Sequence, residues 1–160
     1  MASGAAAPAA TTEPNWLTER RRKGAALASE LNLPTQKQKG WEFTDLSDLD
    51  LDSYEPAQAS IRGVESGVDS DGGPPVVMPL AEAAGQLGDL VRDRFGSVVP
   101  MEDPFVARNE ANWRDGVLVY VPRGQHLEQP LELSVLHEVD GSELDWRVLI
   151  VLEEGAEAEV

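Results

Sequence analysis

The chain has 160 residues, enough for one domain with a small appendage, and its formal net charge is −16. Residues 1–40 carry six basic and three acidic side chains, whereas residues 41–160 carry seven basic and twenty-six acidic ones. Residues 41–160 are acidic enough to repel phosphate groups, which argues against a nucleic-acid partner. The chain has no cysteine, which excludes disulfides and thiolate-ligated zinc or iron–sulfur sites within it. It also lacks a secretory signal pattern and a long apolar run, so we expect a cytoplasmic protein without a membrane span.

The N-terminal part combines a tail with a helix. Residues 1–14 are rich in Ala, Thr and Pro and have little to bury, so we expect a disordered tail. Asn15 can cap a helix that begins at Trp16. Leu33 ends it, because the residue before Pro34 is pushed out of the α region.

One face of this helix carries a thin stripe: Trp16, Arg20, Gly24, Leu27 and Leu31. The basic cluster of residues 20–23 could contact RNA or an acidic partner. A solvated helix face is the simpler interpretation.

A polar loop follows over residues 34–46 and ends on two aromatic residues. Trp41 and Phe43 are two positions apart, so on an extended strand they point the same way. We expect both to pack against the first helix.

The acidic stretch after this loop has part of a calcium-binding pattern. Asp48, Asp50 and Asp52 have the spacing that opens an EF-hand loop. Ser53 and Ala59 stand where that loop needs glycine and glutamate. We therefore predict no calcium site.

In the middle of the chain, Gly and Pro residues interrupt short segments that could form strands or helices. Residues 59–64 and 76–78 are strand candidates, and residues 68–75 are expected to form a mobile connector. Apolar residues then recur at helical spacing over residues 80–95, which predicts a second helix. Gly96 stands at its expected C′ position.

Residues 105–113 suggest one or two more helical turns, and from residue 116 onward we expect only strands. The strand candidates are residues 117–121, 131–136, 146–152 and 157–160. Turn signals separate them at Asp115-Gly116, Pro122-Arg123-Gly124, Pro130, Asp140-Gly141 and Gly155. Residues 131–135 alternate apolar with polar, which predicts one buried face. Residues 148–151 are apolar on both faces and should be covered on both sides.

His126 and His137 are the only histidines, and His126 lies two positions before Glu128. An alternating strand would place that pair on one face, as a weak metal site. Two ligands are too few for tight binding, so a solvent-exposed histidine near a turn is the better interpretation.

Four carboxylates near the C-terminus could form an acid/base cluster: Glu153, Glu154, Glu157 and Glu159. A glycosidase needs two carboxyls held about 5–10 Å apart in a cleft, whereas these flank a turn. The sequence also offers no Ser/His/Asp order and no Gly-rich phosphate loop. We therefore assign no catalytic, cofactor-binding or metal-ligating residue.

Three blocks resemble the SufB/SufD proteins of the SUF iron–sulfur cluster assembly system. The first is Leu33-Pro34-Thr35 with Trp41, Thr44 and Leu46, which resembles the SufD branch. The second is Phe105-Val106-Ala107, Asn109, Ala111, Asp115-Gly116-Val117, Tyr120-Val121-Pro122, Gly124 and Pro130 with the apolar run after it. The third is residues 149–156. Arg108 departs from the pattern, which usually has an apolar residue there, and Glu42-Phe43 replaces a basic residue and a tyrosine.

The resemblance implies an α+β, mainly β fold. Residues 15–104 would form an N-terminal helical region, and residues 105–160 would form the first rungs of a right-handed parallel β-helix that continues beyond this chain. It also implies a non-catalytic scaffold subunit that pairs with a SufB-like subunit and a SufC-like ATPase through the full-length protein. The complex would handle an iron–sulfur cluster, and the family's functional residues would lie beyond Val160.

Two other classes remain open from the residues alone: a cupin-like or carbohydrate-active β domain, and a generic acidic protein-interaction module. A cupin needs a histidine pair two positions apart, and His126 has none at position 124 or 128. Residues 155–160 start a strand and then stop, so we expect an N-terminal piece of a longer protein whose isolated form associates. Only two or three strand–turn units follow residue 116, which predicts marginal stability.

Overall fold

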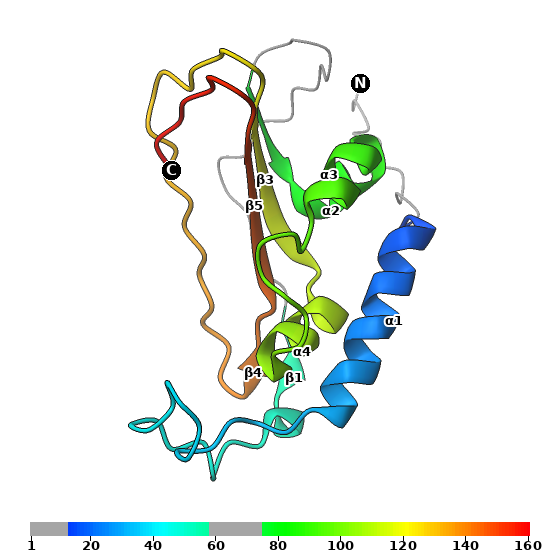
Figure 1. Ribbon diagram of the computed structural model, residues 1–160, viewed down its shortest axis with the longest axis vertical. Helices are drawn as coiled ribbons and strands as arrows, with labels where there is room; N and C mark the ends of the chain where they lie inside the picture. Colours follow the sequence, from blue (N-terminus) through cyan, green and yellow to red (C-terminus); the bar gives the residue numbers. More distant parts are fainter. Residues whose placement is uncertain (1–12, 58–74) are drawn as a thin grey trace, which may run out of the picture.

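The computed structural model describes residues 13–57 and 75–160 (Figure 1). Its elements in chain order are α1 (Asn15–Glu30), the 3-10 turn η1 (Leu51–Ser53), β1 (Glu55–Pro56), β2 (Val76–Pro79), α2 (Leu80–Gln86), α3 (Gly88–Arg94), α4 (Pro104–Asn112), β3 (Asp115–Val121), β4 (Ser142–Glu143) and β5 (Trp146–Leu152). Residues 1–12 of the tail expected over 1–14, the strand expected over 59–64, and residues 68–74 of the connector expected over 68–75 lie outside the described residues. No helix in the described part of the chain is long and apolar enough to cross a membrane.

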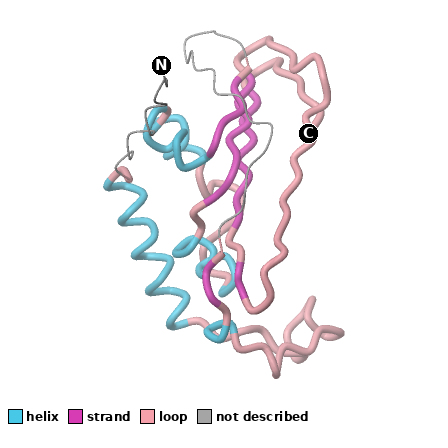
Figure 2. The backbone as a smooth tube through the Cα atoms, turned by 180° about the vertical axis from the view of Figure 1, so that it is seen from behind, coloured by secondary structure: helices cyan, strands magenta, loops and turns pink. Residues whose placement is uncertain are grey.

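A three-stranded sheet in the order β2–β3–β5 forms the centre of the described structure. β2 runs antiparallel to β3, with Val76 opposite Tyr120. β5 runs parallel to β3. The helices lie on one side of this sheet, and the extended segment of residues 127–141 runs down the other side (Figures 1 and 2).

The parallel pairing keeps one register from end to end. Asp115 pairs with Trp146 and Val121 with Leu152, so each residue faces the one 31 positions later. The same offset continues past the strands, where His126 forms an isolated parallel bridge with Glu157. Residues 115–133 are here called the first unit and residues 146–160 the second unit. The two units run parallel in this register from residues 115 and 146 as far as residues 126 and 157.

The two faces of β3 build two separate apolar clusters, because successive side chains of a strand point to opposite faces. Leu118 and Tyr120 face the helices and pack with Leu80, Val91 and Trp113 in the larger cluster. Val117, Val119 and Val121 face the other way, against Leu131 and Leu133. The side chains of these five residues, 117–121, are all buried, so β3 is the central strand in packing as well as in pairing.

The predicted second helix over residues 80–95 is wrong as a single element. The chain forms α2 and α3 with a break at Leu87, whose backbone leaves the helical region at φ −116° and ψ 40°. Gly85 and Gly88 flank this break, and glycine costs about 1 kcal/mol relative to alanine inside a helix. The predicted stop is confirmed, since Gly96 follows the end of α3 with φ 71°.

The first helix is confirmed with a corrected start. Asn15 lies inside α1, and Pro14 occupies the N-cap position without any side-chain capping bond. The buried residues of α1 are Leu17 and Gly24, so Leu17, which is absent from the predicted stripe, faces the core. Arg20 and Arg21 are half-buried, whereas Arg22 and Lys23 are exposed.

The four strands expected after residue 116 have different outcomes. Residues 117–121 and 146–152 are confirmed as β3 and β5. Residues 131–136 form no strand, although Leu131 and Leu133 pack inward as their alternation predicts. Residues 157–160 contribute only the bridge at Glu157.

Asp115-Gly116 is wrong as a turn, because both residues begin β3. Gly116 is needed there for another reason: a Cβ at this position would collide with the carbonyl of Arg147 on the neighbouring strand. The turns at Gly124, Gly141 and Gly155 are confirmed by φ values of 65°, 71° and 70°.

The two aromatic residues of the polar loop, Trp41 and Phe43, have different environments. Trp41 stacks on Phe105 of α4 at a centroid distance of 5.7 Å. Phe43 is 99% exposed, because residues 42 and 43 form a turn rather than an extended strand. The expected packing of both rings against α1 is therefore wrong.

Candidate functional site

An apolar row lies on the surface of β5. Val148, Ile150 and Leu152 point to the same face as Val117, Val119 and Val121, because paired residues of parallel strands share a face. The three side chains on β3 are buried, yet those on β5 are 44%, 47% and 45% exposed. The expectation that residues 148–151 are covered on both sides is thus wrong for the described residues.

A groove of about 650 Å³ runs along the outer edge of β5. β5 lines the groove through residues 146–150, and the end of α3, the loop after it and residues of α4 line the rest. Val98 on that loop is 89% exposed. Among the described strands β5 pairs with β3 alone, so its outer backbone edge and its apolar row are both open to a further layer of structure.

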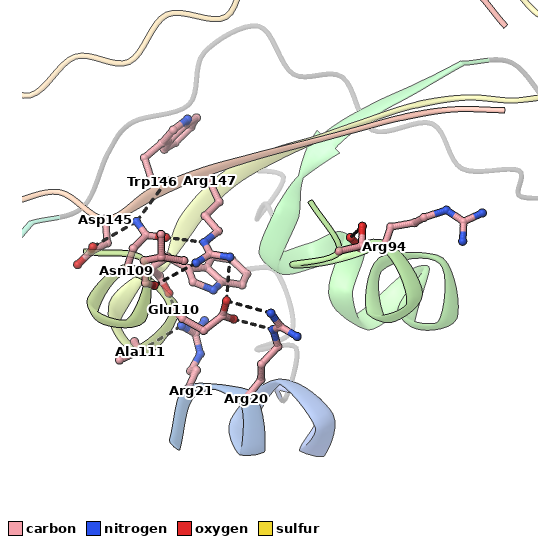
Figure 3. A network of polar contacts seen from close by, with 12 residues as sticks. Arg20, Arg21, Arg94, Asn109, Glu110, Ala111, Asp145, Trp146 and Arg147 are labelled. Atoms are coloured by element: carbon pink, nitrogen blue, oxygen red, sulfur yellow. Dashed lines mark hydrogen bonds and ion pairs between the residues drawn. The ribbon is translucent and has the colours of Figure 1, made fainter. Parts of the chain in front are cut away.

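Behind this surface lies a buried ion-pair network, centred on Glu110 (Figure 3). Glu110 projects from α4 and its side chain is only 1% exposed. Arg20 of α1 donates to it twice, Nε to Oε1 at 2.8 Å and Nη2 to Oε2 at 3.2 Å. Arg147 of β5 reaches the same carboxylate from the other side, with Nη1 2.9 Å from Oε2. One carboxylate thus joins α1, α4 and β5.

The network continues from Arg147 towards Asp145, which directly precedes β5 (Figure 3). Arg147 donates through Nε to Oδ1 of Asn109, and Asn109 donates through Nδ2 to Oδ1 of Asp145 at 3.2 Å. Burial raises the pKa of the Asp145 carboxyl to about 6, and the negative charge of Glu143 adds to the effect. Burial also lowers the pKa of Arg147, while the charge of Glu110 opposes that shift.

Aromatic rings cover the guanidinium groups. Arg20 and Arg147 lie over the ring of Phe95 at 5.2 and 4.9 Å, and Arg21 lies over Trp113 at 4.5 Å. A bidentate, ring-covered pair of this kind holds its geometry firmly, because each charge is satisfied only in one arrangement. The network therefore fixes where α1 sits against the sheet, and its charged groups are bonded to one another.

A second clamp holds the acidic segment around η1. Arg108 of α4 donates to both carboxylate oxygens of Glu143 at 2.7 Å, to Asp52 at 2.8 Å and to the carbonyl of Leu51 at 2.6 Å. The bond to Glu143 raises the pKa of Arg108. The arginine that departs from the family pattern thus has a defined structural task, since it ties η1 to β4.

The aspartates with partial EF-hand spacing are Asp48, Asp50 and Asp52, and two of them have partners within the protein. Asp50 caps η1 by accepting from the backbone of Asp52, and Asp52 pairs with Arg108. Asp48 is exposed. Within residues 13–57 and 75–160 no three His, Asp or Glu side chains converge as a metal site would require.

His126 directly precedes the extended segment of residues 127–141, and His137 lies within it. His126 approaches Glu157 at 3.4 Å, and no ion pair joins it to Glu128 among the described residues. His137 contacts the hydroxyl of Ser142. The backbone bridge between His126 and Glu157 joins the two stacked units just after their corners.

The four C-terminal carboxylates belong to residues of the second unit that are exposed or half-buried. Glu153 lies 3.9 Å from Arg94, Glu154 pairs with Arg123, and Glu157 approaches His126. Glu159 is exposed, and its carbonyl accepts from the backbone of Leu131. These contacts are structural cross-links between neighbouring segments.

Sequence reasoning missed the network residues Glu110, Arg147, Asn109 and Asp145. A weak signal existed for Glu110 alone, because it lies three positions after the buried Ala107 on the same face of a short helix. Its partners Arg20 and Arg147 are distant in sequence, so no local pattern predicts the ion pairs.

Comparison with known proteins yields one family. Residues 51–133 match the family described as the SufBD protein N-terminal region, which is more than half of the chain. The matched range includes β3 and the corner at Gly124.

Individual relatives carry the same family name. The chain is 39% identical over 80 residues to an iron–sulfur cluster assembly SufBD family protein of Synechocystis sp., and 35% identical over 69 residues to one of Mycobacterium tuberculosis. It is 33% identical over 69 residues to the iron–sulfur cluster assembly protein SufB of Bacillus subtilis. These matches cover 48%, 42% and 42% of this chain but only 16%, 8% and 15% of the relatives, which are therefore much longer.

Proposed function

The chain belongs to the SufBD family, and from this premise we propose that it is the N-terminal part of a non-catalytic scaffold subunit in iron–sulfur cluster assembly. The family match over residues 51–133 is the observation that carries the proposal. In this role the protein holds its partners in place, and the cluster is cargo of the complex rather than a cofactor of this segment.

The proposed scaffold is a right-handed parallel β-helix whose first rungs are the two stacked units. Support comes from the constant offset of 31 positions, which relates β3 to β5 and His126 to Glu157. Glycines with positive φ recur at the same offset, Gly124 at one corner and Gly155 at the next. Stacked parallel strands with repeated corners are the signature of a solenoid.

The open surface of β5 supports an assembly role. A scaffold needs faces that accept further rungs or subunits, and the apolar row of Val148, Ile150 and Leu152 is such a face. The buried charges of the Glu110 network are bonded to one another, which suits support of the fold better than chemistry.

The proposed partners are a SufB-like subunit and a SufC-like ATPase, which the full-length protein would bind in the cytoplasm. Assignment to the SufD branch rests on Leu33-Pro34-Thr35 and on Trp41, Thr44 and Leu46. Trp41 closes the loop against Phe105, so this block contributes to the packing of α4.

Affinity purification of the tagged full-length protein from its native host tests the proposal. A high-salt wash removes proteins retained only by the acidic surface. We expect an ATPase and a second SufBD-family subunit to be retained in stable amounts. Their absence would overturn the scaffold assignment, and a stoichiometric metal bound by the purified chain would favour the cupin-like alternative.

A further inference from the structure

A small groove with a cationic lining lies between the N-terminal half of α1 and α3, here called the α1–α3 groove. Its volume is about 380 Å³, and it is lined by Trp16, Glu19, Arg20, Arg22, Lys23 and Arg92. Four cations and one carboxylate therefore surround it, on a chain whose net charge is −16. A local excess of positive charge on so acidic a protein marks a place where anionic groups are attracted.

Two of these cations are already engaged. Arg20 is bonded to Glu110, and Arg92 lies 3.0 Å from Asp89 and 3.5 Å from Asp93. Arg22 and Lys23 are different, because both are exposed and neither has an ion-pair partner within residues 13–57 and 75–160. The attraction of the groove for an anion therefore rests on Arg22 and Lys23.

The groove also has a firm apolar wall. Trp16 is half-buried, and its ring meets Phe95 edge-on at a centroid distance of 6.4 Å. Phe95 in turn lies beneath the guanidinium of Arg20, so the indole rests on a fixed layer. A side chain laid against Trp16 would gain apolar contact beside the two free cations.

We propose that the α1–α3 groove binds a short acidic peptide segment of a partner protein, with its carboxylates on Arg22 and Lys23 and an apolar side chain against Trp16. The volume holds a few side chains and suits a linear segment rather than a folded domain. The α1–α3 groove shares no lining residue with the groove along β5, so its binding does not depend on the scaffold role.

Charge geometry favours a peptide over a nucleic acid. A nucleic acid carries its phosphates at close, regular spacing and would extend past the groove over the acidic body. The Debye length at physiological salt is about 8 Å, so only charges within the groove and at its rim act on the ligand. A short peptide can place its carboxylates at Arg22 and Lys23 alone.

Fluorescence anisotropy with a fluorescein-labelled decapeptide of Glu and Asp that contains one Leu tests the proposal on the full chain. The variant is Arg22→Glu/Lys23→Glu, and the matched control is Lys37→Glu/Lys39→Glu in the exposed loop of residues 35–40, which changes the net charge equally. We expect the first variant to weaken binding at least about tenfold and the control less than about twofold. Circular dichroism should show that both variants fold.

Several outcomes would overturn the proposal. Failure of the peptide to bind the unaltered chain is one such outcome. Equal weakening by both variants is another, because it would show a field effect of the whole protein. Tighter binding of oligodeoxythymidine at the same salt would assign the groove to nucleic acid. A dimer that only Arg22→Glu/Lys23→Glu dissociates would assign it to the Asp-rich residues 45–52 of a second copy.

Discussion

Gly155 packs directly against Gly124, since a Cβ on Gly155 would lie 3.8 Å from the Cα of Gly124. Both glycines have positive φ, and the amide of Gly124 donates to the carbonyl of Glu154 at 3.1 Å. The two corners therefore turn in the same way and are hydrogen-bonded to each other. This match keeps the strands before the corners and the bridge after them in one register.

Replacing Gly155 by alanine should destabilise the chain by about 1 kcal/mol, because a side chain at φ 70° is strained. Urea unfolding followed by circular dichroism measures the change. Gly88→Ala is the matched control: Gly88 begins α3, has no positive φ and has open space around it, so alanine should be neutral or stabilising. Equal losses in the two variants would contradict the role of the corner.

Glu110→Gln should cost about 3 kcal/mol of unfolding free energy, because it leaves the guanidiniums of Arg20 and Arg147 partly buried without their anion. The control is Glu154→Gln, whose pair with Arg123 is 75% exposed on both sides. That variant should change stability by less than about 0.5 kcal/mol. Similar small effects for both would show that the network does not hold α1 in place.

Asp145 should make the chain less stable as pH rises. Its folded-state pKa of about 6 lies above the ordinary value of 3.8, so the folded state binds the proton more tightly. The contribution to stability is fully present below about pH 3.8 and is lost as pH rises through about 6. Because the carboxyl is only half-buried, we expect a loss of about 1 kcal/mol.

The variant Asp145→Asn separates this effect from the other carboxylates. Its uncharged amide cannot ionise and can still accept from Asn109. Urea unfolding at pH 4 and pH 7 should give similar stabilities for the two chains at pH 4 and a more stable variant at pH 7. A variant that is less stable at pH 7 would refute the prediction.

The apolar row on β5 should drive self-association of the isolated chain. Ile150→Lys places a charge in the middle of this row and should reduce association in light scattering at high protein concentration, with little loss of stability because Ile150 is 47% exposed. Val139→Lys is the control, since Val139 is 64% exposed but lies outside the row. A clean monomer at high concentration, or equal effects of the two variants, would contradict the prediction.

Local patterns in the sequence predicted the elements that depend on local physics. Residues 146–152 form β5 as their β-branched and aromatic run indicates. The glycines at positions 96, 141 and 155 have the positive φ that only glycine adopts readily. The family resemblance is also confirmed, through the match over residues 51–133.

Features that depend on distant partners were not predictable in this way. Residues 131–136 alternate as a strand does, but alternation reports which side is buried, whereas a strand also needs a neighbour along its length. Glu110 meets Arg20 and Arg147 only because α1 and β5 are brought against α4 by the fold. The break at Leu87 is the reverse case, since its flanking glycines were visible but the helical periodicity continued across them.

The burial of Trp113 gives the chain an internal optical reporter. Its indole is fully shielded from solvent, packs at a tilt against Phe95 with a centroid distance of 5.4 Å and lies under the guanidinium of Arg21. Arg21 belongs to α1, so release of that helix would admit water to the indole and shift its fluorescence to the red. In a variant whose other three tryptophans are replaced by phenylalanine, undocking of α1 could then be followed by emission while the sheet signal in circular dichroism stays intact, which separates a local opening from global unfolding.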